Sequence, residues 1–155
     1  MRVPNPFQDT GRHFYMTVKP FALCVRLILF DQHGHILVLR RSPQSKTNPG
    51  KWELPGGKID TGEVFDEALK REILKETGFT VAIHTAAGTA MQETNEYRVV
   101  NLVMVGSILS GGLSISKEHV EYRWAGLPEI AALDKADWFT EYFGMYMKAA
   151  VPAQE

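Results

Sequence analysis

Two glutamates, Glu72 and Glu76, stand where an apolar helix face is expected. Winding residues 63–77 at about 100° per residue, with Phe65 set at 0°, places Glu72 at about −20° and Glu76 at about +20°. The apolar members of the same face are Ala68, Leu69 and Ile73. Carboxylates on an inward face lose solvation and repel each other, so they require a compensating cation. The pattern indicates a bound metal ion.

The residues around these acids have a characteristic spacing. Gly57 is followed after five residues by Glu63, and after seven more by the run Arg71-Glu72-Ile73-Leu74-Lys75-Glu76-Thr77-Gly78-Phe79. This pattern resembles the box of the Nudix (MutT-like) hydrolase family, Gly-x5-Glu-x7-Arg-Glu-U-x-Glu-Glu-x-Gly-U, in which U is a bulky apolar residue. Every fixed position matches except one, because Lys75 stands where the first acid of the Glu-Glu pair, normally a metal ligand, is expected.

The resemblance implies roles for particular residues. Glu72 matches a metal ligand that serves some members as the general base, and Glu76 matches a second ligand. The backbone carbonyl of Gly56 also coordinates metal in related enzymes. Arg71 and Glu63 match an orienting pair among the catalytic residues, in which the arginine ties the helix to the start of the box. Their separation of eight residues requires that Glu63 lie just before the regular helix, or that the junction fold back.

Two positions leave alternatives open. Related enzymes often place a further metal ligand or base in the loop before a strand such as residues 119–124, which favours Glu118. Glu121 is the competing candidate, and a solvated loop acid is the plain alternative. Lys75 lies at about −80° on the helical wheel, where its ammonium either fills space near a missing metal or pairs with Glu72, or else extends into solvent. One carboxylate is missing in either case, so fewer or more weakly held Mg²⁺ ions are expected, with Mn²⁺ as a substitute.

Composition fits one domain spanning residues 1–155, with 1–16 as an irregular N-terminal arm. The chain is 45% hydrophobic, enough to bury one core. Its net charge of −1, without a basic tract, favours a small nucleotide substrate over extended nucleic acid. The longest apolar run is broken by Arg26 and is too short to span a bilayer, so no membrane partner is expected. The lone Cys24 and the absence of a signal-type leader predict a cytoplasmic protein. A homodimer is compatible with these features.

The remaining segments are expected to position the acids. Residues 21–30 and 35–41 predict a β-hairpin. The box helix over 63–77 is expected to be capped by Thr61 or Asp60 and to end at Gly78. Further strands and helices are expected over residues 80–91, 97–109, 119–124, 127–133 and 138–149. This order predicts an α/β layered domain. The resemblance makes it specific as a Nudix fold, a mixed β-sheet sandwiched between α-helices, with the box as loop–helix–loop.

The leading hypothesis is Mg²⁺-dependent hydrolysis of a nucleoside diphosphate linked to another moiety, as membership of the family would imply. A nucleoside triphosphate, in its normal or oxidised form, is the first choice of substrate, and a nucleotide sugar such as ADP-ribose is the second. The alternative is a catalytically weak Nudix domain that binds a nucleotide as a sensor or partner module. The substitution at Lys75 is the support for that alternative.

Overall fold

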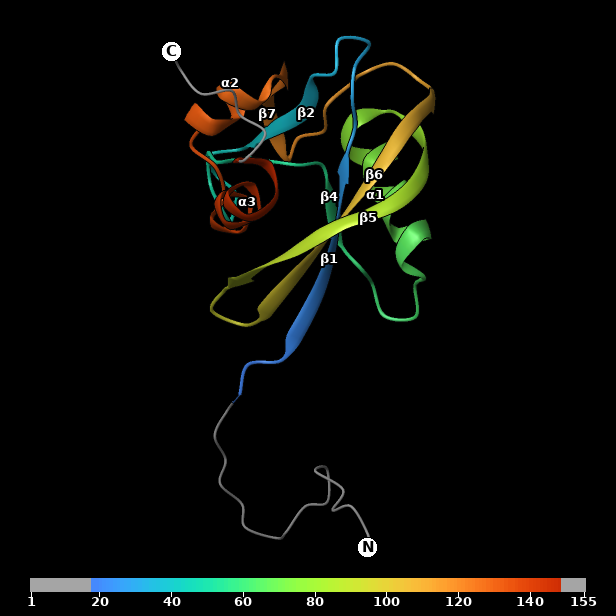
Figure 1. Ribbon diagram of the computed structural model, residues 1–155. Coiled ribbons are helices and arrows are strands. Elements are labelled where there is room, and N and C mark those ends of the chain that lie inside the picture. Colours follow the sequence, from blue (N-terminus) through green and yellow to red (C-terminus); the bar gives the residue numbers. More distant parts are fainter. Residues whose placement is uncertain (1–17, 149–155) are drawn as a thin grey trace, which may run out of the picture.

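The computed structural model describes residues 18–148, so the expected N-terminal arm lies outside the described residues (Figure 1). The elements, in chain order, are β1 Phe21–Ile28, β2 Ile36–Arg41, β3 Trp52–Glu53, β4 Gly56–Lys58, α1 Phe65–Thr77, β5 Thr80–Glu93, β6 Arg98–Ser110, β7 His119–Ala125, α2 Leu127–Ala132, α3 Asp137–Tyr142 and the π-helical turn η1 Phe143–Met147. Within this part of the chain, no helix has both the length and the apolar character needed to cross a bilayer.

The strands form two sheets. A four-stranded mixed sheet has the order β4-β1-β6-β5, with β1 and β6 parallel and the other pairs antiparallel. A three-stranded antiparallel sheet has the order β3-β2-β7. The short strands β3 and β4 lie in the approach to the box, where the sequence did not indicate them.

The prediction of a β-hairpin over residues 21–30 and 35–41 is wrong, because the two segments pair only next to the turn between them. Phe30 and Ile36 form an isolated bridge, and the Leu37 N–H donates to the Leu29 carbonyl at 3.1 Å. The two strands then separate into different sheets, because β1 pairs with β4 and β6 while β2 pairs with β3 and β7. Each strand thus has long-range partners on both edges, and these replace the local pairing.

Helices cover both faces of the four-stranded sheet, with α1 on one side and α3 on the other (Figure 1). On the α1 side, Val25 and Leu27 of β1 belong to the same buried cluster as Leu69 and Ile73. On the α3 side, the cluster is built around Trp138, with Ile28, Val103 and Phe139 among its members. Because side chains alternate along a strand, β1 contributes to both cores. The fold expected from the resemblance, a mixed sheet between helices, is confirmed.

Helix α1 begins later than expected and ends where expected. Its N-cap is Val64 in an extended conformation, without a side-chain capping bond, so the proposal that Thr61 or Asp60 caps it is wrong. Glu63 precedes the helix, and its carboxylate accepts the Asp60 N–H at 3.0 Å, so the loop is closed on itself instead. At the other end, Gly78 has φ 78° and its N–H donates to the Leu74 carbonyl.

Where the sequence predicts one helix over 138–149, the structure has a shorter α-helix followed by a π-helical turn. The α-helix ends at Tyr142, and the five residues Phe143–Met147 continue as a π-helix. This wider turn places both Phe143 and Met147 in the core beneath the sheet.

Replacing Gly78 with alanine should destabilise the fold. A Cβ there would lie 2.6 Å from the Gly112 carbonyl oxygen, and the left-handed backbone at φ 78° disfavours any residue with a Cβ. We expect Gly78→Ala to lower the free energy of unfolding by about 1–2 kcal/mol in denaturant titration. The control is Gly112→Ala, whose Cβ would meet nothing within 4 Å. Equal stability of the two variants would contradict this account.

Candidate active site

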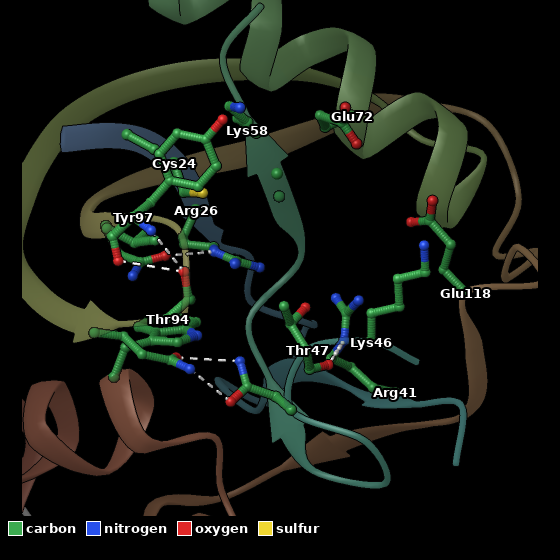
Figure 2. A pocket seen from close by; sticks show the side chains of 18 of the residues that line it. Cys24, Arg26, Arg41, Lys46, Thr47, Lys58, Glu72, Thr94, Tyr97 and Glu118 are labelled. Atoms are coloured by element: carbon green, nitrogen blue, oxygen red, sulfur yellow. Dashed lines mark hydrogen bonds between the residues drawn. The ribbon is translucent and has the colours of Figure 1, made fainter. Parts of the chain in front are cut away.

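A cavity of about 570 Å³ opens beside α1 on the face of the four-stranded sheet that carries α3. Figure 2 shows Glu72 and Glu118 on one side of it and Thr94 and Tyr97 on the other. The lining includes several charged residues: the acids are Glu72, Glu76, Glu96 and Glu118, and the cations are Arg26, Arg41, Lys46, Lys58 and Lys75. The cavity therefore offers oxygen donors at one side and cationic groups along its walls.

The two inward acids of α1 lie where the helical periodicity places them. Glu72 is 8% exposed and Glu76 is 2% exposed. Two consecutive glycines of β4 lie beside these acids at positions that leave no space for a Cβ. A Cβ on Gly57 would lie 2.7 Å from the carboxyl carbon of Glu72, and a Cβ on Gly56 would overlap the Val25 carbonyl oxygen. The Gly56 N–H donates to Glu76 Oε2 at 2.9 Å, which places the backbone of Gly56 beside the buried acid.

Burial changes the acidity of Glu76. Desolvation and the nearby charge of Glu53 raise the pKa of Glu76 to about 8, against the opposing effects of the Gly56 N–H and Arg26. The carboxylate is therefore short of compensating positive charge in the protein alone. A divalent cation in the cavity would supply that charge.

Arg71 and Glu63 form the pair that the resemblance implied. Arg71 Nε donates to Glu63 Oε2 at 2.7 Å and Nη2 donates to Glu63 Oε1 at 2.9 Å, which is a bidentate contact. The contact is geometrically allowed because Glu63 lies before the first helical residue. The remaining guanidinium nitrogen of Arg71, Nη1, donates to Glu72 Oε1 at 2.6 Å. The hydrogen bonds from Arg71 and the Asp60 N–H lower the pKa of Glu63 to about 2.

Glu118 lies at the cavity, and Glu121 does not line it. Glu121 is engaged on the strand surface by Arg40 at 3.4 Å and Arg123 at 3.0 Å. Lys75 donates to Glu118 Oε1 at 3.0 Å, and this contact raises the pKa of Lys75. Neither expectation for Lys75 is met in full, since its ammonium pairs with Glu118 instead of Glu72 or solvent alone. Both side chains of the pair are about half exposed.

A buried charge network behind the acids escaped the sequence reasoning. Its centre is Glu53, 1% exposed, whose Oε1 lies 2.9 Å from Arg41 Nη1 and 3.0 Å from His119 Nε2. Arg26 Nη1 lies 3.4 Å from the other carboxylate oxygen. Burial alone would raise the pKa of Glu53, but Arg26, His119 and Arg41 together lower it to about 2. The one signal in the sequence was an acid within the apolar approach to the box.

The far wall of the cavity combines polar and aromatic side chains. Arg26 Nε donates to the Asn101 Oδ1 at 3.0 Å, and its guanidinium lies over the Trp138 ring, 4.7 Å from the centroid. Lys58 Nζ lies 4.5 Å from the centroid of the Tyr97 ring. These groups come from three strands, the β5–β6 turn and α3, so no local sequence pattern brings them together.

The residues present fit a divalent cation. Glu72, Glu76 and Glu118 supply carboxylate oxygens, the ligands that Mg²⁺ and Mn²⁺ prefer. Two of the three are buried, and Gly57 leaves space for the Glu72 carboxylate where a Cβ would collide with it. The substitution at Lys75 removes one oxygen donor from the set.

The fold and the box together define the class of protein. The chain matches the NUDIX domain over residues 20–145, and it belongs to the Nudix family. A solved structure of the MutT protein from Methanosarcina mazei Go1 is similar with a TM-score of 0.78 and 33% identity, covering 86% of this chain and 98% of that one.

Two curated relatives are similar over shorter stretches. A putative 8-oxo-dGTP diphosphatase of Bacillus subtilis (strain 168) is 32% identical over 87 residues, which covers 54% of this chain and 57% of the relative. An ADP-ribose pyrophosphatase of Methanocaldococcus jannaschii is 29% identical over 110 residues, covering 66% and 63%. The chain thus matches less than two thirds of the length of either relative.

The titration of Glu76 should be visible in the stability of the metal-free protein. Its pKa rises from 4.5 to about 8 on folding, so the folded state retains a proton that the unfolded state releases. The protonated Glu76 carboxyl therefore contributes to the free energy of unfolding. This contribution is fully present below pH 4.5 and is lost as the pH rises through about 8, and it amounts to at most about 5 kcal/mol. Denaturant titration in chelator should show this loss between pH 5 and 8.

The variant Glu76→Gln should flatten that pH dependence. The exposed Glu67→Gln, on the same helix, should keep the wild-type profile. Because the pKa of Glu53 is lowered, its contribution to stability is lost only as the pH falls below 4.5. The titration of Glu53 is therefore separate from the loss expected between pH 5 and 8. A Glu76→Gln profile as steep as that of the wild type would exclude Glu76 as the source.

Proposed function

We propose that the chain is a Mg²⁺-dependent hydrolase of a nucleoside diphosphate linked to another moiety, with a nucleoside triphosphate as the preferred substrate. The observation that carries the proposal is one continuous cavity that joins the acids of the box to the polar wall of β1 and β6. Its volume of about 570 Å³ lies within the range of small-molecule sites. Membership of the Nudix family supports the same reaction class.

The chemistry divides between the metal and the protein. Bound metal would neutralise phosphate charge and lower the pKa of a water molecule. Glu72, Glu76 and Glu118 are the proposed protein ligands, and Glu72 is also the proposed acceptor of the water's proton. The water oxygen forms a bond to phosphorus while the bridging phosphorus–oxygen bond breaks, and the leaving phosphate group takes the bond's electron pair. Arg71, held by Glu63, keeps Glu72 in position.

The charge of the walls supports a substrate with several phosphates. Lys46 and Lys58 line the cavity and have no carboxylate partner within the described residues 18–148. They are free to meet phosphate oxygens as point charges. The names of similar proteins fit this choice: an 8-oxo-dGTP diphosphatase and a nucleoside triphosphatase, NudI of Salmonella agona, favour the triphosphate, and an ADP-ribose pyrophosphatase supports the second choice.

A substrate panel tests the proposal directly. Normal and oxidised nucleoside triphosphates and ADP-ribose would be incubated with the full chain and Mg²⁺ or Mn²⁺, and the products separated. Release of pyrophosphate with a nucleoside monophosphate is expected for the preferred substrate. Release of ribose phosphate from ADP-ribose alone would reverse the order of the two substrates. No turnover of any compound would overturn the hydrolase.

A second candidate function rests on the Lys75–Glu118 ion pair. This pair engages a proposed ligand and adds positive charge beside the acids. A site weakened in this way would suit a domain that binds a nucleotide without turning it over, as a sensor or partner module. Nucleotide binding in calorimetry, combined with no turnover in the panel, would favour this candidate.

Replacing Glu72 with glutamine should remove activity without unfolding the protein. The change removes a ligand or base and also removes one of two neighbouring buried charges. We expect a loss of at least about a hundredfold in kcat/KM on the substrate that the panel identifies, with an unchanged circular dichroism spectrum. Glu67→Gln, an exposed change on the same helix, should retain activity. Wild-type rates in Glu72→Gln would remove Glu72 from the mechanism.

The variant Lys75→Glu restores the acid that the family pattern contains. If the position is a damaged ligand site, Mg²⁺ binding should tighten and turnover rise, by up to about tenfold. A Mg²⁺ titration of activity on one substrate measures both effects, with Lys70→Glu as a control for the same charge change on the exposed face of α1. Unchanged metal dependence with a raised KM would instead show that Lys75 contacts substrate phosphate.

A further inference from the structure

His119 is a buried residue with one unpaired ring nitrogen. It is 3% exposed, and its Nε2 lies 3.0 Å from Glu53 Oε1. Its Nδ1 is fully buried and has no hydrogen-bond partner among the described residues. A buried polar atom without a partner is costly, so such an atom in a site needs an explanation.

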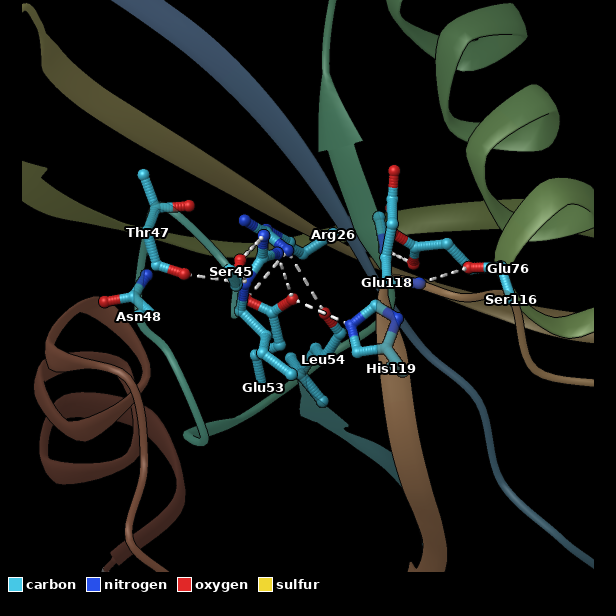
Figure 3. A network of polar contacts seen from close by, with 12 residues as sticks. Arg26, Ser45, Thr47, Asn48, Glu53, Leu54, Glu76, Ser116, Glu118 and His119 are labelled. Carbon is cyan, nitrogen blue, oxygen red and sulfur yellow. Dashed lines mark hydrogen bonds and ion pairs between the residues drawn. The ribbon is translucent and has the colours of Figure 1, made fainter. Parts of the chain in front are cut away.

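The unpaired nitrogen lies beside the proposed metal ligands. One donor atom from each of Glu76, Glu118 and His119 lies within 4.8 Å of the others. In Figure 3 one ring nitrogen contacts Glu53, and the other lies on the side of Glu76 and Glu118. The span is close to that of donors around a single cation, because ligands about 2.1 Å from a metal lie at most about 4.2 Å apart.

Glu53 fixes the orientation and the tautomer of the ring. Its carboxylate is held between Arg26 and Arg41 and can only accept hydrogen bonds when ionised. The proton of neutral His119 therefore resides on Nε2, and the lone pair of Nδ1 faces the acids. A carboxylate that accepts one N–H of an imidazole while the other nitrogen binds metal is a recurrent arrangement in metalloproteins.

We propose that His119 Nδ1 is a metal ligand, which forms with Glu76 and Glu118 a mixed nitrogen–oxygen position for a divalent cation. The inference rests on the metal site of the proposed function and adds to it a donor in place of the acid missing at Lys75. The Lys75–Glu118 pair is half exposed, and ion pairs of that kind contribute little, so a cation can displace the ammonium.

An imidazole donor changes which cation the site prefers. Mg²⁺ favours sites made only of oxygen donors, whereas imidazole nitrogen strengthens the binding of first-row transition ions. The site should therefore bind Mn²⁺ more tightly than Mg²⁺, and Co²⁺ more tightly than Mn²⁺.

The test uses Mn²⁺ and the full chain after removal of metal by chelation. Calorimetric titration should show that His119→Gln weakens Mn²⁺ binding by at least about tenfold while Mg²⁺ binding changes less. The control is His84→Gln, because His84 is exposed and bonds to Ser107 outside the cavity. Equal Mn²⁺ affinity of His119→Gln and the wild type would overturn the proposal.

Spectroscopy provides a readout that does not depend on the stability of the variant. Electron spin echo spectra of Mn²⁺ bound to protein containing ¹⁵N-histidine should show coupling to one imidazole nitrogen. The same coupling should persist in His84→Gln and vanish in His119→Gln. Mn²⁺ binding without nitrogen coupling in the wild type would overturn the proposal and leave His119 as a positioning residue or a proton acceptor only.

The outcomes separate this inference from the proposed function. Nitrogen coupling in a protein that hydrolyses no nucleotide would support the ligand and reject the hydrolase. Hydrolysis with Mg²⁺ in a protein that shows no nitrogen coupling to Mn²⁺ would support the hydrolase and reject the ligand.

Discussion

Three buried carboxylates, those of Glu53, Glu72 and Glu76, impose the constraint on which the site is built. A carboxylate removed from water takes up a proton unless a cation or donors compensate its charge. Glu53 lies against two arginines and Glu72 accepts a hydrogen bond from Arg71 Nη1. Within residues 18–148, Glu76 accepts a single hydrogen bond, from the backbone N–H of Gly56. The unequal compensation leaves the charge deficit at the position that faces the cavity.

The same charges connect the two sheets. Arg26 belongs to the four-stranded sheet, whereas Glu53, Arg41 and His119 belong to the three-stranded sheet. Their contacts with Glu53 therefore cross from one sheet to the other (Figure 3). Breaking one partner would leave uncompensated charge in the interior, which is more costly than losing a surface pair. The Glu53 network therefore stabilises the contact between the two sheets.

Local patterns predicted the box, because its geometry is set within one helix. The 3.6-residue period identified Glu72 and Glu76 as inward-facing, and the preference for glycine after a helix C-terminus identified Gly78 as the end of α1. Burial at Glu53 and His119 could not be predicted in this way, since their partners are 12 to 66 residues away in the chain. The hairpin prediction is wrong for the same reason, because β1 and β2 each pair with strands from elsewhere in the chain instead of with each other. The predicted helix cap is wrong because α1 begins at Phe65, so Thr61 and Asp60 lie too far before it to be the N-cap.

Strand β1 has a consequence for how this scaffold can diversify. Its register sets Cys24 opposite Lys58 of β4 and Asn101 of β6, so one strand holds both sides of the cavity floor at the fixed spacing of a sheet. A slip of one residue would turn Arg26 into the α1 core. The floor therefore does not accommodate insertions, whereas residues 46–48 and 94–97 lie in loops, which tolerate changes in length and sequence. Changes in length that reshape this cavity are accommodated in those loops and not in β1.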